Sequence, residues 1–259
     1  LESGSEILRR AAGPYVPGLG PNLRLAAEPA ATVLKLMAQP HLSAFPDLHQ
    51  VYLDLSCNGP ELIHRCCNCL PKFGSVQRLH IVCCDSGLTD EHLQPFFEGL
   101  RWVPTLQDLS LHSSNNRISV ELLGKAGERI GSCSHLTHLD LNFKNNQIGT
   151  FPDSSPFAGG IGRCSKLESV ALDFANNKVT SSFLTALAQG SLLQSGKLSG
   201  GIGLLTRVKT FVLIVEGNEV SGATLEILGR ALQGCVALED LKFVVSKNEI
   251  TPKQASKNG

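Results

Sequence analysis

Hydrophobic and polar residues alternate along this chain in a pattern that returns about every 30 residues. One copy contains Leu136, Leu139, Leu141, Phe143, Asn146 and Ile148, which gives the frame L-x-x-L-x-L-x-F-x-x-N-x-I. The frame starts at Leu48, Val76, Leu106, Leu136, Leu167, Val208 and Leu238. Its first, fourth and sixth positions are Val, Leu, Ile or Phe in all seven copies. A period of this length predicts a stack of similar structural units.

Each copy predicts a short strand followed by a helix. From the fourth to the eighth position apolar and polar residues alternate, as at Leu139, Asp140 and Leu141, which indicates a strand. Between frames the apolar spacing becomes i, i+3, i+7, which indicates an amphipathic helix. Helices that return the chain to successive parallel strands build an α/β solenoid, with the strands on its concave face and the helices on its convex face.

The eleventh frame position is almost always asparagine. Six copies have Asn58, Asn116, Asn146, Asn177, Asn218 and Asn248, and the remaining copy has Ser86. An amide side chain both donates and accepts hydrogen bonds. We therefore expect one asparagine per layer to satisfy backbone groups where each strand ends, which is a structural role rather than a binding site.

The frame resembles that of the leucine-rich repeats from Leu48 to Ile250. Its length and helical backs are similar to the ribonuclease-inhibitor type, which Ran GTPase-activating proteins and NLR receptors share. The resemblance implies a horseshoe-shaped fold and a protein-binding scaffold. A regulator of a partner enzyme, such as a GTPase activator, is the alternative, although that subfamily's working residues have no match here. The chain departs from the usual motif by placing the asparagine two residues later, after an extra apolar position such as Phe143.

The ends of the chain depart from the frame. Residues 1–47 lack it: residues 13–21 are rich in turn-forming Gly and Pro, and Leu23 to Met37 predicts a helix that caps the stack. Seven repeats then fill residues 48–259. No complete cap follows the seventh strand, which suggests a fragment of a longer protein or an end covered by a partner.

Two glycine-rich stretches interrupt the later repeats. A 41-residue spacing between Leu167 and Val208 predicts an insertion loop around Gly190 to Gly203. Gly149 to Gly160 has too much Pro and Gly for a full helix, and Gly159-Gly160-Ile161-Gly162 predicts a tight turn that enters the next strand, rather than a phosphate-binding loop.

Most of the nine cysteines fall at apolar frame positions. Cys133, Cys164 and Cys235 lie three residues before a frame, and Cys66 and Cys83 occupy apolar columns, so we expect core packing. For the other four, which are Cys57, Cys67, Cys69 and Cys84, zinc binding and disulfide formation stay open, although two C-x-x-C pairs at structural-zinc spacing are absent. The odd count and the lack of an N-x-S/T sequon favour a reducing compartment, so we expect an intracellular, cytoplasmic location.

Charge and motifs argue against several function classes. The chain has 23 Lys+Arg and 23 Asp+Glu, so it lacks the basic excess that favours nucleic acid or anionic lipid. No apolar run reaches the roughly 18 residues that insertion into a membrane requires. G-x-S-x-G, Walker and H-E-x-x-H motifs are absent. We therefore expect no enzymatic activity, no cofactor and no metal.

The concave face is the predicted binding surface, because alternate strand positions there are free of core packing. Over the third to fifth repeats it carries a His and carboxylate cluster of Asp108, His112, His138, Asp140, Asn142 and Asp173. This cluster is a solvated polar face, a pH-sensitive protein-docking site or a metal site. Over the fifth to seventh repeats the face becomes apolar through Ala171, Val212, Ile214 and Val244, which predicts a contact surface. Tyr52, Asp54, His80 and Lys242 complete the candidate residues for a protein partner or a missing part of the same polypeptide.

Overall fold

The computed structural model describes residues 22–25, 48–149, 155–190 and 201–250. Eight parallel strands form one sheet there, and their order in space follows their order in the chain. They are β1 (Asn22–Leu25), β2 (Gln50–Asp54), β3 (Arg78–Val82), β4 (Asp108–His112), β5 (His138–Asn142), β6 (Ser169–Asp173), β7 (Thr210–Ile214) and β8 (Asp240–Val244). From β2 to β8 each strand covers the third to the seventh frame positions, which confirms the predicted register.

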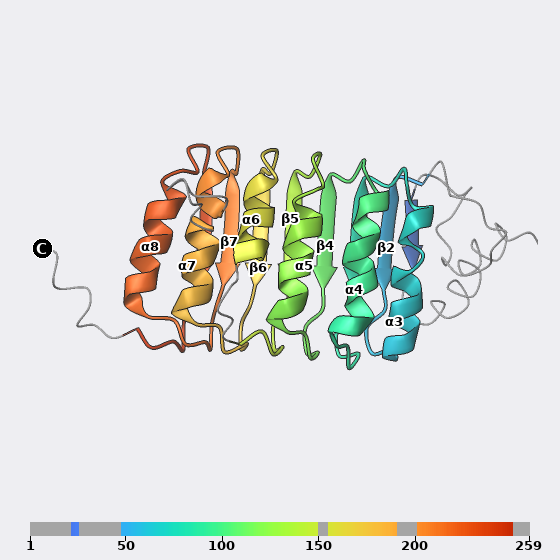
Figure 1. Ribbon diagram of the computed structural model, residues 1–259, viewed down its shortest axis with the longest axis horizontal. Coiled ribbons are helices and arrows are strands. Elements are labelled where there is room, and N and C mark those ends of the chain that lie inside the picture. Colours follow the sequence, from blue (N-terminus) through green and yellow to red (C-terminus); the bar gives the residue numbers. More distant parts are fainter. Residues whose placement is uncertain (1–21, 26–47, 150–154, 191–200, 251–259) are drawn as a thin grey trace, which may run out of the picture.

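From β2 to β8, helices return the chain from each strand to the next. They are α3 (Pro60–Cys67), α4 (Asp90–Gly99), α5 (Val120–Ile130), α6 (Ser155–Arg163), α7 (Ser181–Gln189) and α8 (Gly222–Leu232), with the 3-10 turns η1 (Leu70–Lys72), η2 (Leu100–Trp102) and η3 (Ile202–Leu204). Figure 1 shows the helices side by side in a single layer against the sheet. The chain therefore folds as the predicted α/β leucine-rich-repeat solenoid, with strands on the concave face and helices on the convex face.

The fourth and sixth frame positions build the core between the strands and the helices. Successive side chains of a strand point to opposite faces, so these positions turn inward while their neighbours face the concave side. Leu109 and Leu111 of β4 are fully buried, whereas Leu241 of β8, which occupies the same frame position as Leu109, is 49% exposed. The last described layer thus leaves apolar surface uncovered by any other described residue.

The asparagine ladder bridges consecutive layers as predicted. Asn146 Oδ1 accepts the N–H of Ile118 at 2.9 Å, and its Nδ2 donates to the carbonyl oxygens of Ser113 and Phe143 at 2.8 and 2.9 Å. The amides of Asn116, Asn177, Asn218 and Asn248 bond in the same way. Each buried amide satisfies backbone groups of two layers, which confirms the structural role.

The tenth frame position forms a second column, which the sequence did not reveal. Its residues are Cys57, Asp85, Asn115, Asn145, Asn176, Gly217 and Lys247, and their φ angles lie between 53° and 66°. This left-handed backbone is most accessible to Gly, Asn and Asp. The turn after each strand therefore explains why most residues of this column are of those three types.

Residues 22–25, which precede the first frame, join the sheet as β1. β1 pairs with β2 from Asn22 opposite Gln50 to Leu25 opposite Leu53, so the predicted capping helix is wrong for Leu23 to Leu25. Residues 26–37 lie outside the described residues, as do residues 191–200 of the predicted insertion. Counted back from Leu48, the frame keeps only Leu23 and Leu25 as apolar positions and places Gly20 first, which hid this strand among turn-forming residues.

The glycines near residue 160 are helical, so the predicted entry turn at Gly159 to Gly162 is wrong. They lie in α6, where a Cβ on Gly160 would come within 1.8 Å of the carbonyl oxygen of Gly127 in α5. A Cβ on Gly127 would come within 2.3 Å of Phe157 Cα. These glycines allow two helix backbones to touch, and that close packing offsets the roughly 1 kcal/mol that Gly costs in a helix.

Candidate functional site

The thirteen candidate residues lie on seven neighbouring strands of the concave face. The register places Tyr52 opposite His80 and Asp108 opposite His138. Equivalent residues of adjacent strands lie about 4.8 Å apart, so the surface is continuous from β2 to β8 and about 30 Å long. These positions agree with the repeat frame, and the role of the residues in binding stays a prediction.

Four side chains from successive strands contact one another in a line that we call the Tyr–His–Asp row: Tyr52, His80, His112 and Asp140. The rings of Tyr52 and His80 stack with centroids 4.6 Å apart and an interplanar angle of 28°. His80 meets His112 edge to face at 5.3 Å. His112 Nε2 lies 2.9 Å from Asp140 Oδ2. These contacts fix the orientation of the polar side chains on β2 to β5.

His112 and Asp140 form the charged end of the row. The hydrogen bond to Asp140 raises the pKa of His112, partial burial opposes that rise, and the negative charges of Asp140 and Asp173 add to it. The Ser110 hydroxyl lies 3.4 Å from His112 Nε2 and 3.5 Å from Asp140 Oδ2. The side chains of His112 and Asp140 are 30% and 46% exposed, so water screens the pair, and we expect it to contribute at most about 1 kcal/mol.

Three candidate residues at the seventh frame position also hold turns. Asp54, Asn142 and Asp173 accept, through Oδ1, the backbone N–H of the residue two positions later, at 3.1, 3.0 and 2.9 Å. Such Asx turns are typical of Asp and Asn at the ends of elements. The repeat frame predicts only that these three side chains face the surface, although an Asp or Asn at the end of a strand is also a signal for such a turn. Each keeps a second polar atom for other contacts.

The predicted His and carboxylate cluster divides into two parts. His112 and Asp140 are in contact, and Asn142 lies between His112 and Asp173, while His138 is exposed and its Nδ1 lies 2.9 Å from Thr137 Oγ1. Asp108 lies beside His138 and, among the described residues, takes part in no ion pair. In the described part of the chain, no group of three or more His, Cys, Asp or Glu side chains is arranged to hold a metal ion.

The other end of the concave face carries what we call the apolar patch, formed by Ala171, Val212, Ile214 and Val244. Val212 lies beside Ala171, and Ile214 beside Val244, across the strand pairs β6–β7 and β7–β8. All four side chains are half-buried, and Lys242 is exposed at the edge of the patch. Contiguous apolar side chains of this kind on a sheet face are typical of a contact surface.

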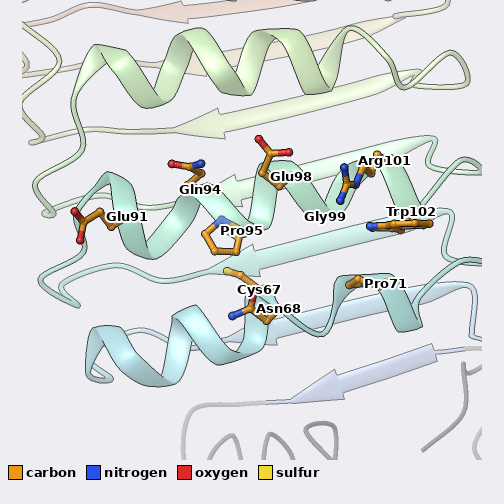
Figure 2. Close-up of a pocket in the computed structure, with 10 residues that line it drawn as sticks. All are labelled: Cys67, Asn68, Pro71, Glu91, Gln94, Pro95, Glu98, Gly99, Arg101 and Trp102. Atoms are coloured by element: carbon orange, nitrogen blue, oxygen red, sulfur yellow. The ribbon is translucent and has the colours of Figure 1, made fainter. Parts of the chain in front are cut away.

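A groove of about 450 Å³ lies on the helical side, between α3 with η1 and α4 with η2. Figure 2 shows Pro71 and Trp102 at one end of this groove and Glu91 at the other. The Trp102 side chain is 50% exposed, and the Arg101 guanidinium lies 5.1 Å from the centre of its ring. Glu98 is already paired with Arg129 at 2.7 Å. Sequence reasoning did not single out this groove, although the chain's one tryptophan lies in it.

All nine cysteines are free thiols. Cys133, Cys164 and Cys235 are buried, which confirms their predicted core positions. Burial raises the pKa of Cys133 to about 11 and that of Cys83 to about 12, so both stay protonated near neutral pH. Cys67 and Cys69 are buried as well, whereas Cys84 is half-buried and Cys57 is exposed at the turn after β2.

Comparisons with known proteins concern the fold alone. No family model matches this chain, and no curated protein matches it. Among solved structures, TLR13 in its complex with ssRNA13 aligns with a TM-score of 0.42 and 14% sequence identity, over 90% of this chain and 29% of the TLR13 chain. The chain therefore spans less than a third of the length of that protein. In the described residues, no helix has the length and apolar character to span a bilayer.

Proposed function

We propose that this chain is a non-catalytic scaffold of the ribonuclease-inhibitor-like leucine-rich-repeat type, which binds a protein partner through its concave face. The continuous surface with one polar and one apolar half is the observation that carries this proposal. The partner is a separate protein or another part of the same polypeptide. Its contact residues are Tyr52, Asp54, His80, Asp108, His112, His138, Asp140, Asn142, Asp173, Val212, Ile214, Lys242 and Val244.

Rigidity of the face supports this function. The asparagine ladder ties each strand end to the next layer, and the Tyr–His–Asp row fixes polar side chains before any partner arrives. A surface that is ordered in advance loses little conformational entropy on binding, so more of the contact free energy appears as affinity.

The shape of the face favours a protein over a small molecule. Small ligands occupy enclosed pockets that cover most of their surface. The candidate residues instead extend along seven strands, which suits an extended partner surface with an apolar anchor and a polar border. We propose a reducing, intracellular compartment for this interaction, because the odd number of cysteines and the lack of an N-x-S/T sequon favour one.

Substitution of the apolar patch tests the proposal. The double variant Val212→Asp and Ile214→Asp places two charges where we propose apolar contact, so capture of the partner from the native source should be lost. Val236→Asp is the control, because Val236 is exposed and lies outside the concave face, and the substitution likewise replaces an aliphatic side chain by a carboxylate. Circular dichroism would establish that both variants fold. Partner capture by the double variant at the native level would contradict the proposed function.

A further inference from the structure

The groove on the helical side has an apolar wall of rings. Pro71 of η1, Pro95 of α4 and Trp102 of η2 line it, and Figure 2 shows Pro95 between Glu91 and Trp102 along its length. Trp102 is 50% exposed, and the Arg101 guanidinium packs against its ring, which restrains the ring's orientation. An exposed, oriented tryptophan beside two prolines is typical of the anchor of a binding surface.

Polar groups without a partner lie at both ends of this groove. The indole N–H of Trp102 has no acceptor among the described residues, and Figure 2 shows the indole nitrogen on the side of the ring toward Pro95. At the other end, Glu91 is exposed and forms no ion pair with any described residue. Pro95 lies inside α4 and has no N–H, so the carbonyl oxygen of Glu91 lacks its helical donor. The groove thus offers a donor at one end and acceptors at the other.

These groups fit an extended, proline-rich segment better than a helix or a strand. A polyproline II segment has no internal hydrogen bonds, so its carbonyl oxygens are free to accept the N–H of Trp102. The carbonyl oxygens of a helix are already used within that helix. Helices and 3-10 turns form both walls of the groove, so no strand edge is available there to pair with an added strand. Proline-rich segments generally dock in grooves with aromatic walls.

The spacing of the groove also matches such a segment. Along α4 and η2, Pro95 and Trp102 are about 12 Å apart, and Glu91 lies about 6 Å beyond Pro95. A polyproline II helix rises about 3.1 Å per residue and repeats every three residues, so the prolines of Pro-x-x-Pro lie on one face about 9 Å apart. Two further residues span about 6 Å. Both distances agree with the groove to within the reach of one side chain.

We propose that this groove binds a proline-rich segment of a protein partner with the pattern Pro-x-x-Pro-x-Lys or Pro-x-x-Pro-x-Arg. The first proline packs on Trp102, the second lies against Pro95, and the cation pairs with Glu91. The second carboxylate of the groove, Glu98, is already paired with Arg129, so Glu91 is the one that complements the charge of the segment. The groove lies on the helical side, so this function is separate from that of the concave face.

Tryptophan fluorescence tests the proposal on the full chain. Trp102 is the chain's one tryptophan, so its emission reports whether the groove is occupied. The probe is the peptide Ala-Pro-Ala-Ala-Pro-Ala-Lys, titrated at low ionic strength. Emission should shift to shorter wavelength and saturate, because the peptide removes the ring from water. The same peptide with alanine at both proline positions, or with glutamate in place of lysine, should bind at least about fivefold more weakly.

Substitutions of Trp102 separate its ring from its N–H group, with a fluorescein-labelled peptide and anisotropy as the readout. Trp102→Ala removes the anchor and should weaken binding at least about tenfold. Trp102→Phe keeps a ring but lacks the donor, and should weaken binding about threefold. Leu204→Ala is the matched control: Leu204 is 47% exposed, also ends a 3-10 turn, and occupies the same position four residues before a frame. It should leave binding unchanged.

Substitution of Glu91 tests the place of the cation. Glu91→Gln should weaken binding of the lysine peptide about threefold, as expected for one solvent-screened ion pair. Glu128→Gln removes the same charge from α5, outside the groove, and should have no effect. Equal effects of these two variants would show that Glu91 does not receive the cation.

Two results would overturn the proposal as a whole. Equal binding by Trp102→Ala and Leu204→Ala would show that the peptide does not occupy this groove. Tighter binding of the peptide without proline would indicate a helical occupant instead. Val212→Asp with Ile214→Asp should leave peptide binding at the native level, so the groove and the concave face are tested independently, and failure of one leaves the other in place.

Discussion

The two halves of the concave face share one backbone register but differ in what their side chains do. In the polar half, His112 and Asp140 bond across strands, and Tyr52 and His80 stack beside them. The apolar patch has no polar side-chain atoms and leaves half-buried aliphatic groups facing outward. The same scaffold thus carries ordered charged side chains on one half of the face and uncovered apolar surface on the other half. We expect the apolar half to supply most of the affinity and the polar half to select the partner.

The largest expected effects come from variants that add charge to the apolar half or remove charge from the polar half. Val212→Asp with Ile214→Asp should weaken partner binding by at least about 100-fold, because it buries charges at the proposed anchor. Asp140→Asn with Asp173→Asn should weaken partner binding only about tenfold, because any ion pair that these exposed carboxylates form with the partner is screened by water. Titration calorimetry with the identified partner measures both. A polar-half effect that exceeds the apolar-half effect would reverse the assignment.

The ladder beneath the two halves should support them equally. Asn116 lies under the polar half and Asn218 under the apolar half, and each accepts two backbone N–H groups and donates to backbone carbonyl oxygens of two layers. Replacement of either by Ala should lower the free energy of unfolding by about 2 kcal/mol, because buried backbone groups lose their partners. Urea denaturation provides the measurement. A clear difference between the two variants would show that the scaffold itself differs between the halves.

The smallest effect concerns the His112–Asp140 pair. Because the pKa of His112 is raised in the folded protein, its stabilising contribution is fully present below its unfolded value of 6.5 and is lost as the pH rises through the folded value. His112→Gln should lower the free energy of unfolding at both pH values, and this loss should be up to about 1 kcal/mol larger at about pH 5.5 than at about pH 8. Urea titrations at both pH values measure this. Asp140→Asn should remove the same difference, and a difference that does not change with pH would exclude a folded-state ion pair.

Most of the scaffold was predictable because the frame has a strict period. Apolar residues at fixed positions determine which side of each strand turns inward, so the strands, their register and the asparagine ladder followed from spacing alone. The concave positions of Val212 and Asp140 followed for the same reason. β1 did not, because Leu23 and Leu25 are too few apolar positions to identify a repeat.

The remaining features depend on contacts between layers, which spacing does not encode. Side-chain direction across strands decides that His112 bonds to Asp140 and leaves His138 apart. The helical glycines near Gly160 depend on the approach of the α5 backbone, which overrides the low helix propensity of glycine. The exposure of Trp102 depends on how η2 sits beside η1, and the position of a residue in the frame does not determine that.

Photo-crosslinking from defined positions tests the concave-face account most directly. A photoreactive group placed at Tyr52, at Val212 and at Glu128 on the helical side is illuminated in the complex with the captured partner. The account predicts crosslinks from both halves of the concave face, at Tyr52 and Val212, and none from Glu128. Crosslinks from Glu128, with none from Tyr52 and Val212, would contradict it.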